Sequence, residues 1–300
     1  MHGILLVDKP RGLTSHDVVR KIRQLYRTRK VGHAGTLDPL ATGVLVVAVG
    51  DGTKILQFLF DDTKSYRATL RLGVATDTFD ADGQVLATRE VPPLDMDKIN
   101  AACRPFRGVI EQLPPMYSAL KHQGVPLYEL ARKGQEIERQ ARQICISRLN
   151  VCSYSAPELT IEVDCSKGTY IRSLASDLGD GLGCGAHLTA LRRLRSGVFS
   201  LENCYTLEQL RQLEQPAAAL IPLPEALGAF AVVYPDVAAV QDLGHGIPPQ
   251  RTSCQLPDGL QPGDLVRLQQ DRQLLAVARY QPDRRREKRG DFELIRVFAG

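Results

Sequence analysis

The sequence lacks any apolar run long enough to cross a membrane as a helix, which needs about 20 residues. It also lacks the pattern of a secretory signal, because MHGILLVDKP places an acid and a lysine close to the N-terminus. These absences predict a cytoplasmic protein with no membrane partner. Apolar residues make up 43% of the chain and charged residues 24%, so an ordinary globular core is expected.

Cysteine pairs in C-x-x-C spacing are absent, and the seven cysteines are an odd number. We therefore expect buried, reduced thiols rather than disulfides or a zinc site. The stretch DTFDADGQ (77–84) is close to a calcium loop, but its first and twelfth positions are Thr78 and Arg89, where acids are needed. No H-E-x-x-H, Walker lysine or G-x-S-x-G occurs. The sequence predicts no metal and no nucleotide cofactor.

Acidic residues are scarce at the N-terminal end. Residues 1–60 hold nine Lys/Arg and four Asp, and the first glutamate is Glu90. A basic region of this kind favours a polyanionic partner such as a nucleic acid. A solvated basic face is the alternative, and charge alone does not separate the two.

Hydrophobic patterning predicts a mixture of strands and helices. ILLVD (4–8) and VLVVAVG (44–50) are typical of fully buried strands, whereas KSYRATLRLG (64–73) and LTIEVDC (159–165) alternate as half-buried strands do. A capping box of Thr14 and Asp17 begins one helix, and residues 170–179 form another, with Thr169 as its expected cap. The basic stretch 114–144 is expected to be mainly helical.

The length of 300 residues favours two domains. Composition shifts at EQPAAALIPLPEALG (214–228), which we interpret as a linker. Short alternating runs follow it at 264–268, 274–280 and 293–298, and they are typical of a small β domain. We therefore place one domain at 1–225 and a second at 226–300.

One carboxylate, Asp38, stands in a loop just before a buried strand. Pro39 restricts its backbone to extended angles, and Gly35 and Gly43 allow sharp turns on either side. A side chain held in this way suits a site in which position matters. A turn aspartate that bonds its own backbone is the alternative.

Arg172 lies in the first turn of the predicted helix, where the helix dipole disfavours a cation. We expect an acid elsewhere in the fold to hold it. A pair with Asp38 would favour the ionised carboxylate. A surface arginine is the alternative.

Several other side chains suit contacts with RNA. Tyr66 and Tyr170 are either core tyrosines or aromatic rings that stack on a base. His33 stands in a glycine-flanked loop, where a core histidine is unexpected, and could stack or insert in RNA. Arg192 and Arg193, in LRRLRSG (191–197), suit phosphates.

Six segments together resemble the motifs of the bacterial tRNA pseudouridine synthase B (TruB) family. In chain order they are LLVDKPRGLTSHDVV, GHAGTLDPLATGVL, KSYRATLRLG, PPMYSALKHQG, CSKGTYIRSLASDLG and GAHLTALRRLRSG. The resemblance covers residues 3–200, and the motifs are long enough to be highly specific. The last 70 or so residues resemble the small PUA-like RNA-binding domain of that family more loosely.

The resemblance implies an α+β pseudouridine synthase fold, with a mixed, largely antiparallel central sheet, flanking helices and a central cleft, followed by a PUA-like β-barrel. Residues 1–225 would be the catalytic domain, with a basic RNA-contacting insert at 115–150, and residues 226–300 the RNA-binding domain. The reaction would isomerise uridine-55 in the T-loop of tRNA without cofactor or metal. The partner would be the T-stem-loop, or elbow, of tRNA, bound by a monomer.

The resemblance also assigns residues. Asp38 matches the essential aspartate of the family, Tyr66 the tyrosine against the target base, and Arg172 the arginine that pairs with the aspartate. Further matches are the substrate-contacting positions His33, Tyr170 and Leu191 and the loop-supporting motif that contains Lys9 and Pro10.

Three alternatives remain. One is a guide-RNA-dependent enzyme of the dyskerin kind, although its loop typically reads closer to GTLDPKVTG than to the GTLDPLATG found here. Another is an RNA chaperone that binds and folds tRNA without chemistry. The last is a hydrolase with an aspartate nucleophile, which would need a second acid that the Asp38 loop lacks.

Overall fold

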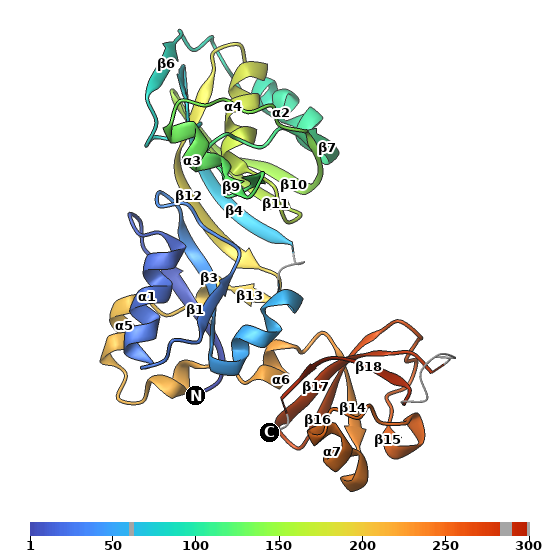
Figure 1. Ribbon diagram of the computed structural model, residues 1–300. Coiled ribbons are helices and arrows are strands. Elements are labelled where there is room, and N and C mark those ends of the chain that lie inside the picture. The colour runs from blue at the N-terminus through green and yellow to red at the C-terminus, as the bar shows by residue number, and fades with distance from the viewer. Residues whose placement is uncertain (60–62, 283–289, 299–300) are drawn as a thin grey trace.

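The computed structural model describes residues 1–59, 63–282 and 290–298. Its main feature is a nine-stranded sheet in the order β1-β3-β12-β4-β11-β10-β7, with β2 paired to β3 and β13 paired to β12 (Figure 1). The strands pair in parallel only between β3 and β12 and antiparallel elsewhere in this sheet. The strands are β1 (Gly3–Lys9), β2 (Val31–Ala34), β3 (Thr42–Val49), β4 (Lys64–Leu72), β7 (Gly108–Gln112), β10 (Arg142–Ser155), β11 (Glu158–Cys165), β12 (Ala186–Ser196) and β13 (Phe199–Ser200).

Helices cover this sheet and connect its strands. The α-helices of residues 1–230 are α1 (Ser15–Leu25), α2 (Met96–Cys103), α3 (Leu127–Arg132), α4 (Ile171–Gly181), α5 (Leu207–Gln212) and α6 (Leu223–Ala226). Short 3-10 helices are η1 (Gly50–Phe58), η2 (Arg104–Phe106), η3 (Leu201–Asn203) and η4 (Pro216–Ala219). Two small hairpins, β5 (Val74–Thr76) with β6 (Val85–Thr88) and β8 (Lys121–His122) with β9 (Val125–Pro126), complete this part. None of these helices, nor any other in the described part of the chain, has the length and apolar character needed to span a bilayer.

The two kinds of strand expected from the sequence are confirmed. In β4, Tyr66, Ala68 and Leu70 are buried, while Arg67 and Arg71 are exposed. Strand β3 is buried on both faces because different elements cover them. Leu45, Val47 and Val49 pack with α1, whereas Val44, Val46 and Ala48 belong to a second cluster with residues of η1 and α6.

The predicted start of α1 is confirmed, whereas the predicted cap of α4 is wrong. The capping box of Thr14 and Asp17 begins α1 as predicted. The expected cap of α4 is wrong, since Tyr170 is the N-cap residue and makes no side-chain capping bond. The Thr169 hydroxyl donates instead to the carbonyl of Ser166. The start of α4 therefore depends on contacts from elsewhere in the fold.

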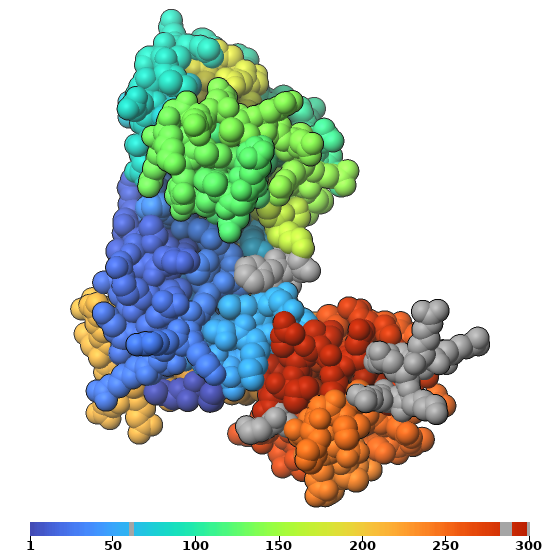
Figure 2. All heavy atoms as spheres, viewed as in Figure 1, coloured from blue at the N-terminus to red at the C-terminus, as the bar shows by residue number. Residues whose placement is uncertain are grey.

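The stretch 114–144 is not mainly helical, which corrects the sequence-based prediction. Only α3 is helical, and the β8–β9 hairpin precedes it. Gly124, in the turn between β8 and β9, and Gly134, just after the end of α3, both adopt positive φ angles, of 86° and 71°. Residues 114–144, green in Figure 2, lie on the surface of the part of the molecule that is drawn at the top.

A second sheet forms the C-terminal lobe, in agreement with the expected small β domain. It contains β14 (Ala231–Pro235), β15 (Cys254–Gln255), β16 (Leu265–Gln270), β17 (Gln273–Tyr280) and β18 (Phe292–Val297), in the order β15-β14-β16-β17-β18. Helices α7 (Val237–Gly244) and η5 (Arg251–Ser253) accompany it. The arrangement is compatible with a PUA-like domain.

The segment 214–228 connects the two sheets, and it is packed against both of them. Ile221 forms an isolated bridge with Ile4 of β1, and Leu223 and Leu227 lie in the apolar cluster that includes Val277 of β17. The C-terminal lobe thereby lies against η1 and α6 (Figures 1 and 2). All seven cysteines are free, as expected, but only Cys103, Cys165 and Cys184 are buried, and Cys152 is exposed.

Candidate active site

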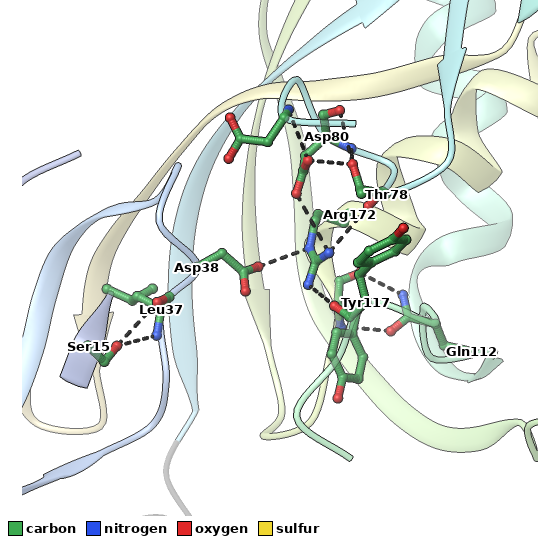
Figure 3. A network of polar contacts seen from close by, with 10 residues as sticks. Ser15, Leu37, Asp38, Thr78, Asp80, Gln112, Tyr117 and Arg172 are labelled. Carbon is green, nitrogen blue, oxygen red and sulfur yellow. Dashed lines mark hydrogen bonds and ion pairs between the residues drawn. The ribbon is translucent and has the colours of Figure 1, made fainter. Parts of the chain in front are cut away.

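The loop that carries Asp38 is fixed by a buried serine of α1. Ser15 Oγ accepts from the backbone N–H of Leu37 at 2.9 Å and donates to the Leu37 carbonyl at 3.2 Å. A turn follows at once, because the N–H of Ala41 donates to the Asp38 carbonyl at 3.0 Å. The aspartate is thus held on both sides by its backbone, and its side chain projects from the loop (Figure 3).

Lys9 supports the same loop from the end of β1. Its side chain is fully buried, and its Nζ donates to the carbonyls of Pro10, Leu13 and Pro39 at 3.0, 2.6 and 3.4 Å. Burial lowers the pKa of Lys9 to about 8, and the negative charge of Asp38 opposes this shift. Lys9 thus connects the end of β1 to Pro39 of the Asp38 loop, and the Pro10 carbonyl is one of its acceptors.

Arg172 is the centre of the polar network drawn in Figure 3. Its Nε lies 2.9 Å from Asp38 Oδ2, so the ion pair expected from the sequence is present. Its Nη2 donates to the carbonyl of Tyr117 at 2.8 Å, and its Nη1 donates to that of Thr78 at 3.3 Å and lies 3.6 Å from Asp80 Oδ2. All of these partners come from segments far from α4 in the sequence, and they fix the guanidinium in one orientation.

Burial and charge act in opposite directions on Asp38. Its side chain remains 39% exposed, whereas that of Arg172 is only 6% exposed, so the carboxylate is the accessible member of the pair. Burial raises the pKa of Asp38 above its ordinary value, and the nearby Asp80 adds to the rise. The Arg172 and Lys9 charges oppose it.

Asp80 is a site residue that the sequence analysis missed. It is 5% exposed and lies in the 77–84 loop, where its Oδ1 accepts from the hydroxyl of Thr78 at 2.6 Å and from the N–H of Asp82 at 3.1 Å. Its other oxygen faces Arg172. The acid-rich pattern of this loop is the available signal in the sequence, although it does not match a calcium loop.

Tyr66 lies in the same apolar cluster as Leu37 and Leu40 of the Asp38 loop, and it is 8% exposed. Burial raises its pKa, the cationic Arg193 opposes the rise, and the Asp38 charge adds to it. The phenol therefore stays protonated at neutral pH. Tyr66 therefore belongs to the apolar cluster that contains residues on both sides of Asp38 in its loop.

Arg193 and Arg192 are adjacent in β12 but differ in burial and in their binding partners. Arg193 is 1% exposed, and it donates to the carbonyls of Val44 at 2.6 Å and Gly35 at 3.1 Å, an arrangement that fits loop support rather than phosphate binding. Arg192 is more exposed and forms an ion pair with Asp8 at 2.7 Å. Arg192 pairs with Arg67 of β4, whereas Arg193 pairs with Tyr66.

Tyr170 directly precedes α4, which carries Arg172, and His33 lies in β2, the strand before the Asp38 loop. Tyr170 is half-buried, and burial raises its pKa while the Ser118 hydroxyl opposes the rise. His33, in β2, packs edge-on against the ring of His16 with centroids 5.8 Å apart. Burial and the charges of His16 and Arg193 lower the pKa of His33, so it is neutral at pH 7.

Leu191 is 8% exposed and packs in the same cluster as Tyr66. The site thus brings Asp38, Arg172 and Tyr66 together with the unpredicted Asp80. Within the described residues, no three His, Cys, Asp or Glu side chains gather as metal ligands do. The arrangement presents one accessible, oriented carboxylate beside a protonated phenol, which suits chemistry on a carbon atom with movement of a proton.

Two family models match the chain. The model of the TruB family pseudouridylate synthase (N terminal domain) matches residues 23–171, and that of the tRNA pseudouridylate synthase B C-terminal domain matches residues 172–227. The curated protein tRNA pseudouridine synthase B of Syntrophotalea carbinolica is 49% identical, over 99% of this chain and 98% of that protein. The protein of the same name from Geobacter sulfurreducens is 47% identical, over 93% of each.

Solved structures resemble the chain over nearly its whole length. One comes from an H/ACA RNP bound to a substrate RNA containing 2'-deoxyuridine, with a TM-score of 0.75 and 27% identity, over 99% of this chain and 85% of that one. Another comes from a Cbf5-Nop10-Gar1 complex, with a TM-score of 0.74 and 28% identity, over 98% of this chain and 84% of that one. These likenesses confirm the fold class expected from the sequence.

Proposed function

The chain belongs to the TruB family of pseudouridine synthases, and we propose that it isomerises uridine-55 in the T-loop of tRNA to pseudouridine. The observation that carries the proposal is the accessible carboxylate of Asp38, held 2.9 Å from Arg172 on a loop that Ser15 and Lys9 fix. The tRNA substrate is supported by the names of relatives that are 47–49% identical over at least 93% of the chain.

The reaction moves one glycosidic bond and one proton. The N1–C1' bond of the uridine breaks, the uracil turns, and a C5–C1' bond forms, while the proton of C5 is lost and N1 gains one. Asp38 is the group that acts on the ribosyl or uracil carbon, and Arg172 orients it. Tyr66 begins as a protonated phenol, so it donates its proton to N1 of the departing uracil, and the resulting phenolate then takes the proton from C5.

A uridine within a folded loop is stacked, and it must be flipped out at a cost of a few kcal/mol before Asp38 can reach it. His33, Tyr170 and Leu191 are the proposed contacts to the flipped base and its neighbours. The basic insert at 115–150 and the domain at 226–300 would hold the tRNA elbow by its phosphates and shape, with 1–225 as the catalytic domain. One chain carries every proposed side chain, so we propose a monomer that acts on cytoplasmic tRNA.

A guide-dependent enzyme is the second candidate, favoured by the likeness to the H/ACA RNP structure. Tritium release from a tRNA transcript containing 5-tritiated uridine separates the two, with no guide RNA, metal or nucleotide added. One equivalent released by the pure protein would support a stand-alone enzyme. Tight tRNA binding without release would contradict it and favour guide dependence or a chaperone.

Asp38→Asn is expected to abolish tritium release while tRNA affinity stays within about a few-fold, because the carboxylate acts mainly on the chemical step. Filter binding and tritium release measure the two quantities. The control is Asp97→Asn, which neutralises an exposed acid in the first turn of α2. Equal losses of binding and turnover for Asp38→Asn would count against a catalytic role.

A further inference from the structure

Gln112, the last residue of β7, binds the backbone of Tyr170 with both ends of its side chain. Its Nε2 donates to the Tyr170 carbonyl at 3.0 Å, and its Oε1 accepts from the Tyr170 N–H at 2.8 Å (Figure 3). The glutamine is 3% exposed. Its amide therefore supplies the donor and the acceptor that a neighbouring strand would otherwise give to Tyr170.

This contact lies where helix α4 has no cap of its own. Tyr170 is the N-cap residue and makes no side-chain capping bond, and Arg172 follows two residues later. The segment after Gln112 is joined to the same helix start, because Ser173 Oγ donates to the Leu113 carbonyl at 3.0 Å and Arg172 Nη2 donates to that of Tyr117. The beginning of α4 is thus fixed from residues 112–117 rather than from its own sequence.

We propose that Gln112 is a positioning residue for the proposed uridine isomerisation, on which this inference rests. By holding the backbone of Tyr170, its amide sets where α4 begins and therefore how Arg172 meets Asp38. A misplacement of about 1 Å at such a site costs about 100-fold in rate. Removing the amide also leaves the Tyr170 N–H without this acceptor, whereas the Tyr170 carbonyl keeps the N–H of Leu174 at 3.1 Å.

The chemistry of the amide makes the proposal testable by pH. Gln112→Glu keeps the size of the side chain, and its carboxylate still accepts from the Tyr170 N–H. The ionised form, however, places negative charge against the Tyr170 carbonyl and has no proton to donate. The protonated form restores the donor, and burial raises the pKa of a carboxyl at such a position.

The experiment measures kcat for tritium release from tRNA over the acid and neutral range for both proteins. We expect Gln112→Glu to lose at least about tenfold in kcat at neutral pH, with a smaller change in KM, and to approach the wild-type kcat as pH falls. Ser173→Ala is the control, since it removes a neighbouring bond to the same segment but cannot titrate. Its kcat relative to wild type should be the same at every pH. A constant ratio for Gln112→Glu in the folded protein would overturn the proposal.

Gln112→Asn is the second variant in case Gln112→Glu does not fold. Its amide is one carbon shorter, so it should lower kcat at every pH, and an unchanged kcat would overturn the proposal. A wild-type protein that releases no tritium would refute the proposed function instead. In that case, the NMR resonance of the Tyr170 backbone amide in Gln112→Glu tests the contact itself. A shift of this resonance with pH, as the carboxyl at position 112 titrates, supports the contact. A resonance that does not shift with pH refutes it.

Discussion

Single residues of the site combine an exposed functional atom with a buried support. Asp38 is accessible, whereas Arg172, Asp80 and Tyr66 are each less than one-tenth exposed. Buried polar groups keep one orientation because every alternative leaves a donor or acceptor without a partner. The rigidity of the site therefore comes from the residues around the aspartate rather than from the aspartate itself.

Tyr66→Phe is expected to lower tritium release by roughly 100-fold or more while the fold and tRNA affinity are kept, because it removes only the hydroxyl that we propose transfers a proton. Turnover, filter binding and thermal unfolding measure the three properties. Tyr280→Phe is the control, since Tyr280 is a buried tyrosine of β17, 6% exposed and outside the proposed site. A wild-type rate for Tyr66→Phe would remove this residue from proton transfer.

The raised pKa of Asp38 predicts how activity depends on pH. If the reaction needs the ionised carboxylate, kcat/KM falls on the acid side at a pH above the ordinary aspartate pKa. Asp80→Asn removes a negative charge that raises this pKa, so its acid limb should move to lower pH. The overall rate should also fall, because Arg172 loses a partner. The pH profile of tritium release checks both effects. The control is Asp82→Asn, which neutralises an exposed acid of the same loop. If the acid limb of the pH profile does not move in Asp80→Asn, the Asp80 charge does not raise the pKa of Asp38.

Among the elements, the junction of β3 and β12 matters most for the site. It is the parallel pair of the large sheet, and it joins the part that carries the Asp38 loop to the part that carries Tyr66 and Arg172. Gly43 pairs with Arg193 here and adopts a φ of 100°. A Cβ atom at this position would lie 2.2 Å from the Arg193 carbonyl oxygen, so only glycine allows the strands to approach.

Gly43→Ala is expected to lower the free energy of unfolding by roughly 2–4 kcal/mol, because backbone strain and a clash with backbone add together. Urea denaturation measures the loss. Gly12→Ala is the matched control, since Gly12 also has a positive φ, of 84°, but nothing lies within 4 Å of an added Cβ. Its loss should stay at about 1–2 kcal/mol. Equal losses in the two variants would show that the clash does not matter.

At the scale of the whole molecule, the two sheets share an apolar cluster. Phe58 of η1 packs edge-on against Phe230 with ring centroids 5.7 Å apart, and Lys54 Nζ lies 5.2 Å from the ring centroid of Phe298. Leu274 and Val277 of β17 join this cluster. The C-terminal lobe is thus attached by packing as well as by the chain, and it contributes no side chain to the proposed catalytic group.

Deleting residues 230–300 is expected to weaken tRNA affinity more than kcat at saturating tRNA, because the lobe would bind RNA without touching the reacting atoms. Filter binding and tritium release measure the two effects. The deletion also exposes Phe58, so the control is Phe230→Ser in the full chain, which loosens the same contact and keeps the lobe. If both variants lose the same amount of tRNA affinity, the loss comes from the broken Phe58–Phe230 contact and not from RNA-binding residues of the lobe. Unchanged affinity after deletion would mean that the lobe does not bind RNA.

Several features could be predicted from the sequence because nearby residues produce them. The alternation of buried Tyr66 and exposed Arg67 follows from strand periodicity, and the start of α1 follows from Thr14 and Asp17, three residues apart. The backbone restriction of Asp38 follows from Pro39. The family follows from long motifs that are contiguous in the chain, and the fold class follows from the family.

Other features depend on residues that only the tertiary structure brings together. The partners of Arg172 come from residues 38, 78, 80 and 117, and the start of α4 depends on Gln112 instead of the expected Thr169. The 114–144 stretch was wrongly predicted as mainly helical, and the packing of the connection at 214–228 could not be predicted, since composition does not reveal what a segment packs against. Local order is encoded by spacing along the chain, whereas a buried polar partner is selected by the geometry of the packed fold.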